Sequence, residues 1–257
     1  MKPKTTTTEA EISIIQVSRA TIEFNILGTS PLIMNRVGEK ARRELLLPRK
    51  KTAADKAGNL KHNPPEEYRA SAYKSVSDTT PTRLLMPTLA FKGAMRSVAV
   101  DIPGAAKAQI GRLTYVEGDY VSIYGIPKAF LTIVRSADMN RTPDVRTRAI
   151  LPTWAARFSV TYAKPLLNEQ TVANLLAAAG LMRGVGDFRQ EKGGGSYGCF
   201  ELVGKNDERF AALIKAGGRV AQDAALENPE PYDTESAELL TWFDAEATRR
   251  GFAVCAA

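Results

Sequence analysis

The chain has 257 residues, of which 44% are hydrophobic and 25% charged, so it is long enough for one large domain or two small ones of ordinary globular composition. Two cysteines and a single histidine, His62, argue against a disulfide framework, a four-thiolate zinc site and most histidine-based catalytic sites. The sequence has no apolar run long enough for a membrane span, and its polar start does not resemble a signal peptide. We therefore expect a cytoplasmic protein with a flexible tail over residues 1–17.

The net charge of +7 is unevenly distributed along the chain. Residues 205–257 hold 6 basic and 10 acidic residues, a net of −4, which leaves 29 basic and 18 acidic residues, a net of +11, in residues 1–204. A basic body of this kind favours an anionic partner, and nucleic acid is the most common one. The alternative is that the charge serves solubility alone.

The first half of the chain predicts a strand, a basic insertion and a helix. Over residues 19–28, Ile22, Phe24 and Ile26 alternate with polar residues, which predicts a half-buried strand. Residues 36–82 are basic and interrupted by prolines, and we interpret them as an insertion with short helices at 38–47 and 65–75. A short strand at 83–86 is followed by a helix at 89–101, with Thr88 as its N-cap. The residues expected on the buried face of this helix are Leu89, Met95, Val98 and Ala99.

The second half predicts strands at 130–136 and 156–162, then a helix at 169–183 capped by Asn168. Apolar residues spaced for burial along that helix are Val172, Leu175, Leu176, Ala179 and Met182. A closing strand at 196–203 and acidic helices at 206–216 and 234–250 complete the chain. The C-terminal segment 205–257 is thus expected to be helical and acidic.

Without the insertions, the expected order is strand, helix, strand, strand, helix, strand. This is the α+β, ferredoxin-like or RRM-like βαββαβ arrangement, with a four-stranded antiparallel sheet and two helices on one face. We therefore predict a single RRM-like domain over residues 18–257. The usual RNA-binding signature of alternating glycine and aromatic residues is absent from its strands, and the fold alone does not specify a function.

The stretch GVGDFRQEKGGGSYGCF, residues 184–200, contains six glycines. It lacks the Gly-Lys-Ser/Thr ending of a phosphate-binding P-loop, and it follows a helix, whereas a dinucleotide-binding loop follows a strand. Arg189 and Lys192, with Gly193 and Gly194 allowing close approach, could instead clamp a phosphodiester. A flexible solvent loop is the alternative.

The stretch MPTLAFKGAMR, residues 86–96, places Lys92 and Arg96 four residues apart on one helix face. Gly93 within this helix costs about 1 kcal/mol relative to alanine, which indicates close approach by a sheet, a neighbour or a ligand. A solvated basic face with an incidental glycine is the alternative.

Together, these two stretches resemble the first-helix motif and the C-terminal glycine-rich loop of the RAMP superfamily of CRISPR-associated proteins. The basic insertion is similar to the helical insertion of the backbone subunits, which form the repeating spine of CRISPR effector complexes. The resemblance implies RNA contacts by the glycine-rich loop, the first helix, and basic residues of the insertion, including Arg42 and Arg43. It also implies contacts by Asn35 and Arg36, just after the first strand, although a structural turn explains these two equally well.

The resemblance further implies a thumb-like hairpin at residues 136–154. This segment carries Arg141, Arg146 and Arg148 around a turn at 142–144, and Met139 or Ile150 would wedge beside a base. An ordinary basic surface loop is the alternative.

The function implied is that of a non-catalytic RNA-binding backbone subunit, without cofactor or metal, that assembles as a filament along a CRISPR guide RNA. Its partners would be the guide RNA, a complementary target nucleic acid, further copies of itself and other effector subunits, with no membrane involved.

Two alternatives remain open. One is a phage or plasmid protein that binds or anneals single-stranded nucleic acid on a similar fold, with aromatic side chains on the sheet stacking on bases. The other is a RAMP-type endoribonuclease that uses His62, or Asp138 and Asp144 in the hairpin.

Overall fold

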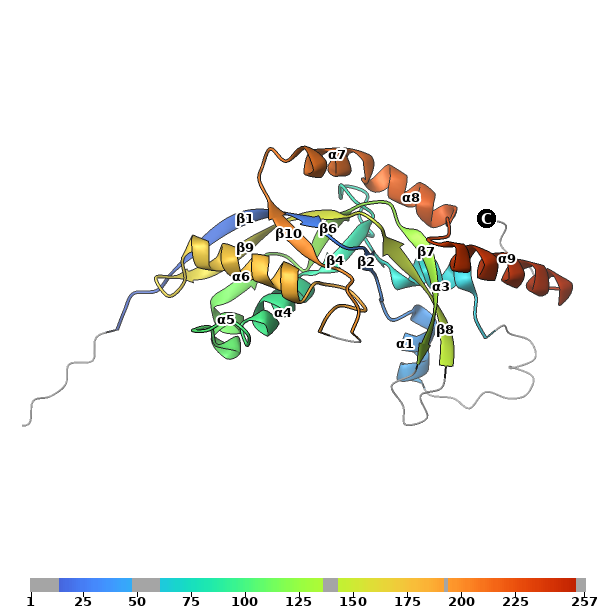
Figure 1. Cartoon of the computed structure of the whole chain (residues 1–257), viewed down its shortest axis with the longest axis horizontal. Helices are drawn as coiled ribbons and strands as arrows, with labels where there is room; N and C mark the ends of the chain where they lie inside the picture. Colours follow the sequence, from blue (N-terminus) through green and yellow to red (C-terminus); the bar gives the residue numbers. More distant parts are fainter. Residues whose placement is uncertain (1–13, 48–60, 136–142, 192–193, 253–257) are drawn as a thin grey trace, which may run out of the picture.

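The computed structural model describes residues 14–47, 61–135, 143–191 and 194–252 as a mixed α+β structure with a curled antiparallel sheet (Figure 1). The larger sheet has the strand order β10-β1-β9-β6-β4-β3, and β5 also pairs with β9. Its strands are β1 (Ser18–Gly28), β3 (Tyr73–Lys74), β4 (Leu84–Pro87), β5 (Thr114–Val116), β6 (Tyr120–Tyr124), β9 (Ala155–Lys164) and β10 (Phe200–Val203). A second sheet has the order β2-β8-β7, with β2 (Leu32–Ile33), β7 (Lys128–Arg135) and β8 (Pro143–Leu151).

The alternating pattern of the first strand is confirmed by β1. Ile22 and Phe24 lie opposite Val160 and Phe158 of β9, and Phe24 and Ile26 are buried in the main core. This face of the sheet is covered by α4 (Thr88–Val98) and α6 (Glu169–Met182), where the rings of Phe91 and Phe158 lie 4.6 Å apart. The period-two pattern therefore marked the side of β1 that packs on the helices.

The predicted N-cap of α6 is also confirmed, because the Asn168 side chain accepts a hydrogen bond of 2.8 Å from the Thr171 backbone N–H. Of the residues expected to be buried in this helix, Val172, Leu175, Leu176 and Ala179 are buried, whereas Met182 is 37% exposed.

The prediction for α4 needs two corrections. Thr88 is the first helical residue and Pro87 the N-cap, and the Thr88 hydroxyl donates to the carbonyl of Gly118 at 3.0 Å. Leu89 is 74% exposed, and Phe91 instead lies in the core beside Met95 and Val98. Leu89 is three and seven residues before Lys92 and Arg96 and shares their face, whereas Phe91 is four residues before Met95 and shares its buried face.

The strand expected at 130–136 as a member of the core sheet was assigned to the wrong sheet. It is β7, which pairs with β8 from Lys128↔Ile150 to Arg135↔Pro143 in the second sheet. An alternating pattern indicates a strand but not its partner. Pro143 and Asp144, expected in the turn, belong instead to β8. Ile150 is buried against Ile33 and Phe130 and is not free to wedge beside a base.

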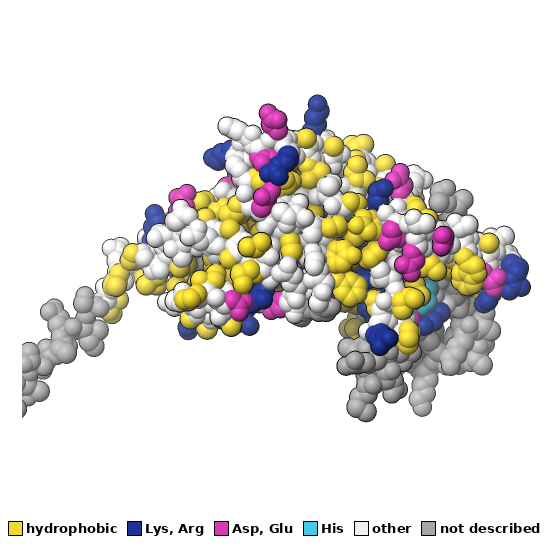
Figure 2. Space-filling model, viewed as in Figure 1, with side chains coloured by type: hydrophobic (Ala, Val, Ile, Leu, Met, Phe, Trp, Pro, Cys, Tyr) yellow, Lys and Arg dark blue, Asp and Glu magenta, His cyan; other side chains and the backbone are white. Residues whose placement is uncertain are grey.

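The remaining helices pack around this framework. Near the second sheet lie α1 (Glu39–Leu46), α3 (Pro64–Ser71) and α9 (Thr234–Arg249). Helix α5 (Lys107–Leu113) follows α4. Helices α7 (Glu208–Ala216) and α8 (Arg219–Glu227) lie on the side of the larger sheet opposite α4 and α6. The sequence did not predict α5, α8, β5 or β6. Figure 2 shows acidic and basic side chains interspersed over α7, α8 and α9.

One buried side chain, Gln222 of α8, joins this helix to the larger sheet. Its Oε1 accepts from the backbone N–H groups of Arg83 and Leu84 at 2.8 and 2.9 Å. Its Nε2 donates to the carbonyl groups of Ile123, Gly125 and Gly217 at 2.8–3.0 Å. These five hydrogen bonds join α8 to backbone groups of the sheet and its loops, so Gln222 fixes the position of α8.

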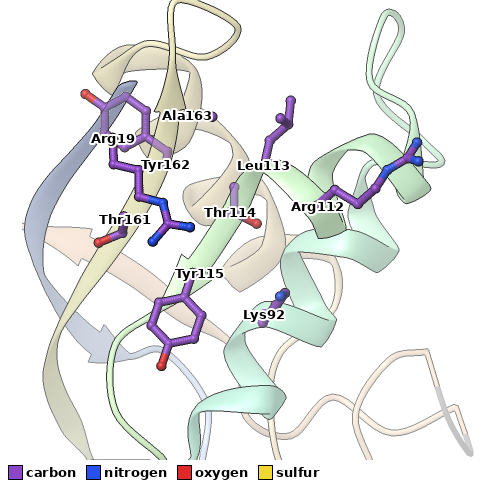
Figure 3. A pocket seen from close by; sticks show the side chains of 9 residues that line it. All are labelled: Arg19, Lys92, Arg112, Leu113, Thr114, Tyr115, Thr161, Tyr162 and Ala163. Carbon is purple, nitrogen blue, oxygen red and sulfur yellow. The ribbon is translucent and has the colours of Figure 1, made fainter. Parts of the chain in front are cut away.

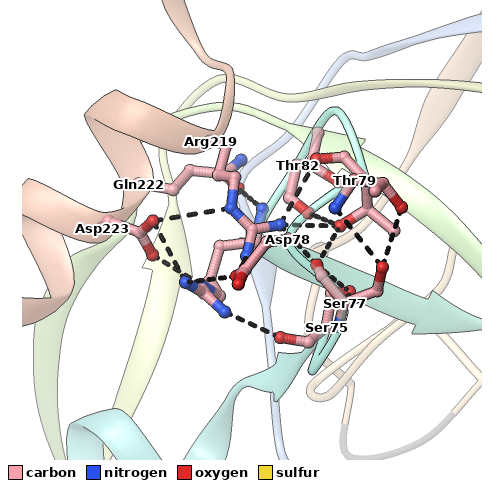
Figure 4. A network of polar contacts seen from close by, with 10 residues as sticks. Ser75, Ser77, Asp78, Thr79, Thr82, Arg219, Gln222 and Asp223 are labelled. Carbon is pink, nitrogen blue, oxygen red and sulfur yellow. Dashed lines mark hydrogen bonds and ion pairs between the residues drawn. The ribbon is translucent and has the colours of Figure 1, made fainter.

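Around Gln222, ion pairs between α8 and the loop before β4 continue this contact to the protein surface (Figure 4). Arg83 Nε lies 2.6 Å from Asp223 Oδ1, and Arg219 Nη2 lies 2.8 Å from Asp78 Oδ1. The arginines here hold the C-terminal helices to the loop that precedes β4.

Within the described ranges, no helix is both long and apolar enough to cross a lipid bilayer. The division into one domain with an insertion at 36–82 stays a prediction.

Candidate nucleic-acid interface

The glycine-rich stretch is folded onto the segment that follows β1. The backbone N–H of Asp187 donates to Ile33 O at 3.0 Å, and that of Gly198 donates to Pro31 O at 2.8 Å. Within the stretch, Val185 N donates to Gly198 O at 2.9 Å. Its described part is therefore held in place at both ends, unlike a linker.

Several of its glycines are required by close backbone packing. A Cβ at Gly198 would lie 1.7 Å from Val185 O, and one at Gly195 would lie 1.9 Å from Phe188 O. Gly198 also has a φ of +72°, which favours glycine. By contrast, Gly194 (φ +67°) has no atom within 4 Å of a Cβ position, so its surface is open. Gly193 and Lys192, both predicted RNA contacts, lie outside the described residues.

Arg189 is held within the loop, and its neighbour connects the loop to α4. Arg189 Nη1 donates to Gly186 O at 2.8 Å, and its Nε lies 3.5 Å from Glu191 Oε2. The Ser97 hydroxyl of α4 donates to Glu191 Oε1 at 2.5 Å, and this bond, with the nearby arginines, lowers the pKa of Glu191. The helix that carries residues 86–96 and the glycine-rich stretch are thus joined by a polar contact that the sequence did not predict.

Arg148, predicted to contact RNA, is buried with its side chain 3% exposed. Its guanidinium donates to Asp187 Oδ2 and to Thr132 Oγ1, both at 2.6 Å, and lies 4.6 Å from the ring centroid of Phe188. Burial lowers the pKa of Arg148, while Asp187 opposes this change. Asn35 Nδ2 donates to the same Asp187 oxygen at 2.9 Å. Arg148 therefore holds the glycine-rich loop to β8, and its charge is not available to a phosphate.

The other predicted contacts lie toward the second sheet. Arg42 and Arg43 of α1 are exposed, and Arg43 forms an ion pair of 2.5 Å with Glu39 on the next turn. Arg146 is exposed on β8, and Arg36 is half-buried. Arg141 lies outside the described residues, as do Met139 and Asp138. These cations do not form one cluster with Lys92 and Arg96 of α4.

Lys92 and Arg96 project from α4 beside a hollow of about 380 Å³ between the edge of the larger sheet and the helices α4 and α5 (Figure 3). We name it the α4–α5 groove, and it is lined by Arg19, Lys92, Arg112, Leu113, Thr114, Tyr115, Thr161, Tyr162 and Ala163. Arg96 packs across Gly111 of α5, where a Cβ would lie 2.7 Å from Arg96 Nε. Gly111 thereby lets α5 approach α4 closely.

The groove has an unbalanced positive charge. Within the part of the chain that the structure describes, Arg19, Lys92 and Arg112 have no carboxylate within 4.0 Å, and neither has Arg96. No carboxylate lines the hollow. Uncompensated cations around a hollow attract phosphate groups.

Sequence reasoning missed Arg19, Arg112 and Tyr115 of this groove. The sequence pattern identifies Arg19 only as the first residue of a strand, and it predicts no element over residues 102–129. The alternation of Arg19 and Thr21 on the polar face of the strand was the one available signal.

His62 lies between two carboxylates. Its Nδ1 is 2.9 Å from Glu67 Oε1, and its Nε2 is 3.1 Å from Asp144 Oδ1. Lys61 also donates to Asp144 at 2.7 Å and, as the largest cause, lowers the pKa of that carboxyl. With both ring nitrogens engaged, His62 fastens the start of α3 to β8 and leaves no nitrogen for a ribose hydroxyl. Among the described residues, no cluster of His, Cys, Asp and Glu is suited to a metal ion.

No protein-family model and no curated protein sequence matches the chain. Among solved structures, it is similar to Cmr6 from Pyrococcus furiosus, with a TM-score of 0.37 and 11% identity over 72% of this chain and 99% of that one. It is also similar to a chain in the Type III-B Cmr-beta structure bound to cognate target RNA, with a TM-score of 0.35, 13% identity, and coverage of 72% of this chain and 59% of that one. TM-scores below 0.5 give no residue correspondence, so the roles below rest on the geometry of this chain.

Proposed function

We propose that this chain is a non-catalytic RNA-binding subunit of a CRISPR effector complex. The observation that carries the proposal is the α4–α5 groove, which is lined by cations from β1, α4 and α5 without carboxylate partners in the described chain. Lys92 and Arg96 belong to the helix that carries the first RAMP-like motif. Cations of this kind bind the sugar–phosphate backbone irrespective of sequence.

In this proposal the glycine-rich loop has a mainly structural role at the RNA interface. The Ser97–Glu191 hydrogen bond and the Arg148–Asp187 ion pair set the position of the loop relative to α4 and β8. The open surface at Gly194 is the part of the loop that we assign to the RNA backbone, together with Lys192 and Gly193. Arg189 contributes through the shape of the loop, because its guanidinium already binds Gly186 O.

The specificity of such a subunit comes from base pairing between guide and target, as in other RNA-guided systems. We propose that copies stack head to tail along the guide, which generates an open helical array. The C-terminal segment 205–257, with its net charge of −4, supplies a face for the basic body of the next copy. Trp242 of α9, 65% exposed, is an apolar side chain available to such a contact.

We also propose that the core is the ferredoxin-like βαββαβ unit, with β5 as its second strand in place of the expected segment 130–136. The strand order β10-β1-β9, with β5 on the outer side of β9, is antiparallel at each pairing. Helix α4 lies between β1 and β5 in sequence, and α6 lies between β9 and β10. This is the order of strands and helices in a split βαβ fold.

The test is recovery of nucleic acid with the chain purified from cells that express it with its genomic neighbours. A discrete RNA of uniform length, protected from nuclease at regular intervals, supports the proposal. Sequence-independent binding of single-stranded DNA, with no such RNA, would contradict it and favour the single-strand-binding alternative. Metal-independent RNA cleavage lost in His62→Ala would instead support the endoribonuclease.

A further inference from the structure

We propose that the α4–α5 groove holds one unstacked base of single-stranded RNA against the ring of Tyr115, with the adjoining phosphate bound by Arg19. This inference rests on the proposed function, and it names the nucleotide unit that the groove takes.

The register of the sheet places these two side chains on the same face. Tyr115 of β5 lies directly opposite Thr161 of β9, and Thr161 lies opposite Thr21 of β1. Arg19 precedes Thr21 by two residues, so its side chain leaves the sheet on the same side as those of Thr21, Thr161 and Tyr115. Figure 3 shows the Arg19 guanidinium and the Tyr115 ring flanking one opening.

Small side chains between them leave room for a base. Arg19 is paired across the strands with Ala163, and Tyr115 with Thr161. Thr161 Oγ1 is engaged with Glu117 Oε1 at 2.8 Å and with Thr21 Oγ1 at 2.6 Å, so it forms a fixed floor. The hollow of about 380 Å³ is within the range of small-molecule sites and suits a single nucleobase.

Tyr115 has the exposure that stacking requires. Its side chain is 54% exposed, and none of the aromatic pairs among the described residues involves it. A tyrosine ring on a sheet surface stacks on any base, since each base has a π face. The cations Lys92 and Arg112 on the opposite wall add attraction for the phosphates on either side of that base.

The carboxylates near this opening limit how the RNA can lie. Glu117 follows Tyr115 by two residues on the same face of β5, and its Oε1 accepts from the Thr161 hydroxyl at 2.8 Å. Its charge repels phosphates at that end. The backbone is therefore expected to lie on the Arg19 side, away from Glu117, with the base directed toward Tyr115.

The experiment uses the full chain and a fluorescein-labelled single-stranded RNA, whose binding is followed by anisotropy. Tyr115→Ala is expected to weaken binding roughly tenfold, and Tyr115→Phe, which keeps the ring, to bind within about twofold of the unsubstituted chain. The control is Tyr120→Ala, because Tyr120 of β6 is 52% exposed but does not line the groove. It is expected to bind as the unsubstituted chain does.

A second readout reports stacking itself. With 2-aminopurine placed at successive positions of the RNA, one position per bound unit is expected to change in fluorescence, and Tyr115→Ala is expected to abolish this change. If the unsubstituted chain binds RNA but Tyr115→Ala leaves both affinity and fluorescence unaltered, the groove inference fails and the proposed function stands. Failure of the unsubstituted chain to bind RNA would overturn the proposed function and the inference together. A loss confined to Tyr120→Ala would overturn the groove inference and favour an aromatic platform on the sheet face.

Discussion

The α4–α5 groove and the contact between α8 and the β4 region both gather cationic side chains, but they differ in what surrounds the charges. In the second region Arg83 is 2.6 Å from Asp223 and Arg219 is 2.8 Å from Asp78, and the guanidinium groups also donate to backbone carbonyls (Figure 4). In the groove, Lys92 and Arg112 have no carboxylate within ion-pair distance among the described residues.

The difference shows why net charge alone does not identify a binding surface. A paired arginine is already neutralised and held in place, so a phosphate would have to displace its partner. An unpaired cation is neutralised only when an anion binds. Substitutions in the paired region should therefore change stability and leave RNA affinity intact, whereas substitutions in the groove should do the reverse.

The largest effect on stability is expected at Gln222, in the contact between α8 and the β4 region. Gln222→Ala removes five hydrogen bonds between a buried side chain and the backbone, so the free energy of unfolding should fall by about 3 kcal/mol. In a chain of this length that corresponds to a drop in melting temperature of roughly 6–12 °C. The matched control is Gln170→Ala on the exposed start of α6, where the side chain bonds only to Asn174 in the described structure. Equal melting temperatures for the two variants would show that Gln222 does not hold α8.

A second substitution separates two arginines of one strand that sequence reasoning treated alike. Arg148→Gln removes a buried guanidinium from Asp187 and Thr132, and we expect a loss of about 2 kcal/mol, reduced from the value for a fully buried pair because Asp187 is 31% exposed. Arg146→Gln, at an exposed position two residues earlier, should change the unfolding free energy by less than about 0.5 kcal/mol. Chemical denaturation of both variants measures this difference. Similar losses would contradict the structural role of Arg148.

Acid should weaken the paired region between α8 and the β4 region. The hydrogen bond from Arg83, followed by the charges of Arg83 and Arg219, lowers the pKa of Asp223 below its value in the unfolded chain. A depressed folded-state pKa stabilises the protein above the unfolded value of about 3.9 and loses that contribution as the pH falls through the folded value. The melting temperature of Asp223→Asn should therefore lie below that of the unsubstituted chain at pH 7, and the two should converge as the pH falls below about 4. A difference that is constant from pH 7 to pH 3 would argue against the ion pair.

The smallest expected effect lies at Gly93, on the groove side of the comparison. No atom lies within 4 Å of a Cβ at this exposed position of α4, so no neighbour in the described chain explains the glycine. Gly93→Ala should raise stability by up to about 1 kcal/mol. If RNA approaches the helix closely here, the same variant should bind RNA a few-fold more weakly, and Gly93→Leu more weakly still. If both variants are more stable and bind RNA with unchanged affinity, α4 at Gly93 is not part of the RNA interface.

The fold was predictable where a local pattern decides it. The alternation of Ile22, Phe24 and Ile26 identified β1, and Asn168 marked the start of α6, because burial periodicity and capping are properties of neighbouring residues. The partner of residues 130–136 was not predictable, since it depends on pairing with β8 that no local pattern encodes. The short strands β5 and β6 carry too few residues for a pattern to emerge.

The candidate site was likewise predictable only where a local pattern decides it. Lys92 and Arg96 were placed on one helix face by their spacing alone. The burial of Arg148 depends on tertiary packing. So does the placement of Arg19 and Arg112, which line the same groove as Lys92. Charge in a sequence identifies cations, but only the fold shows which of them are already neutralised.

The central claim is that the unpaired cations of the groove bind RNA, and the salt dependence of RNA binding tests it most directly. For the double variant Lys92→Ala/Arg112→Ala, the slope of the logarithm of the binding constant against the logarithm of salt concentration should be shallower by about 1.4, or about 0.7 for each phosphate that the variant no longer neutralises. The double variant Arg209→Ala/Arg249→Ala removes the same charge from exposed arginines that are paired with Asp207, Glu201 and Glu246, and it should keep the original slope. A groove variant with the original slope, or two variants with equally reduced slopes, would contradict the claim.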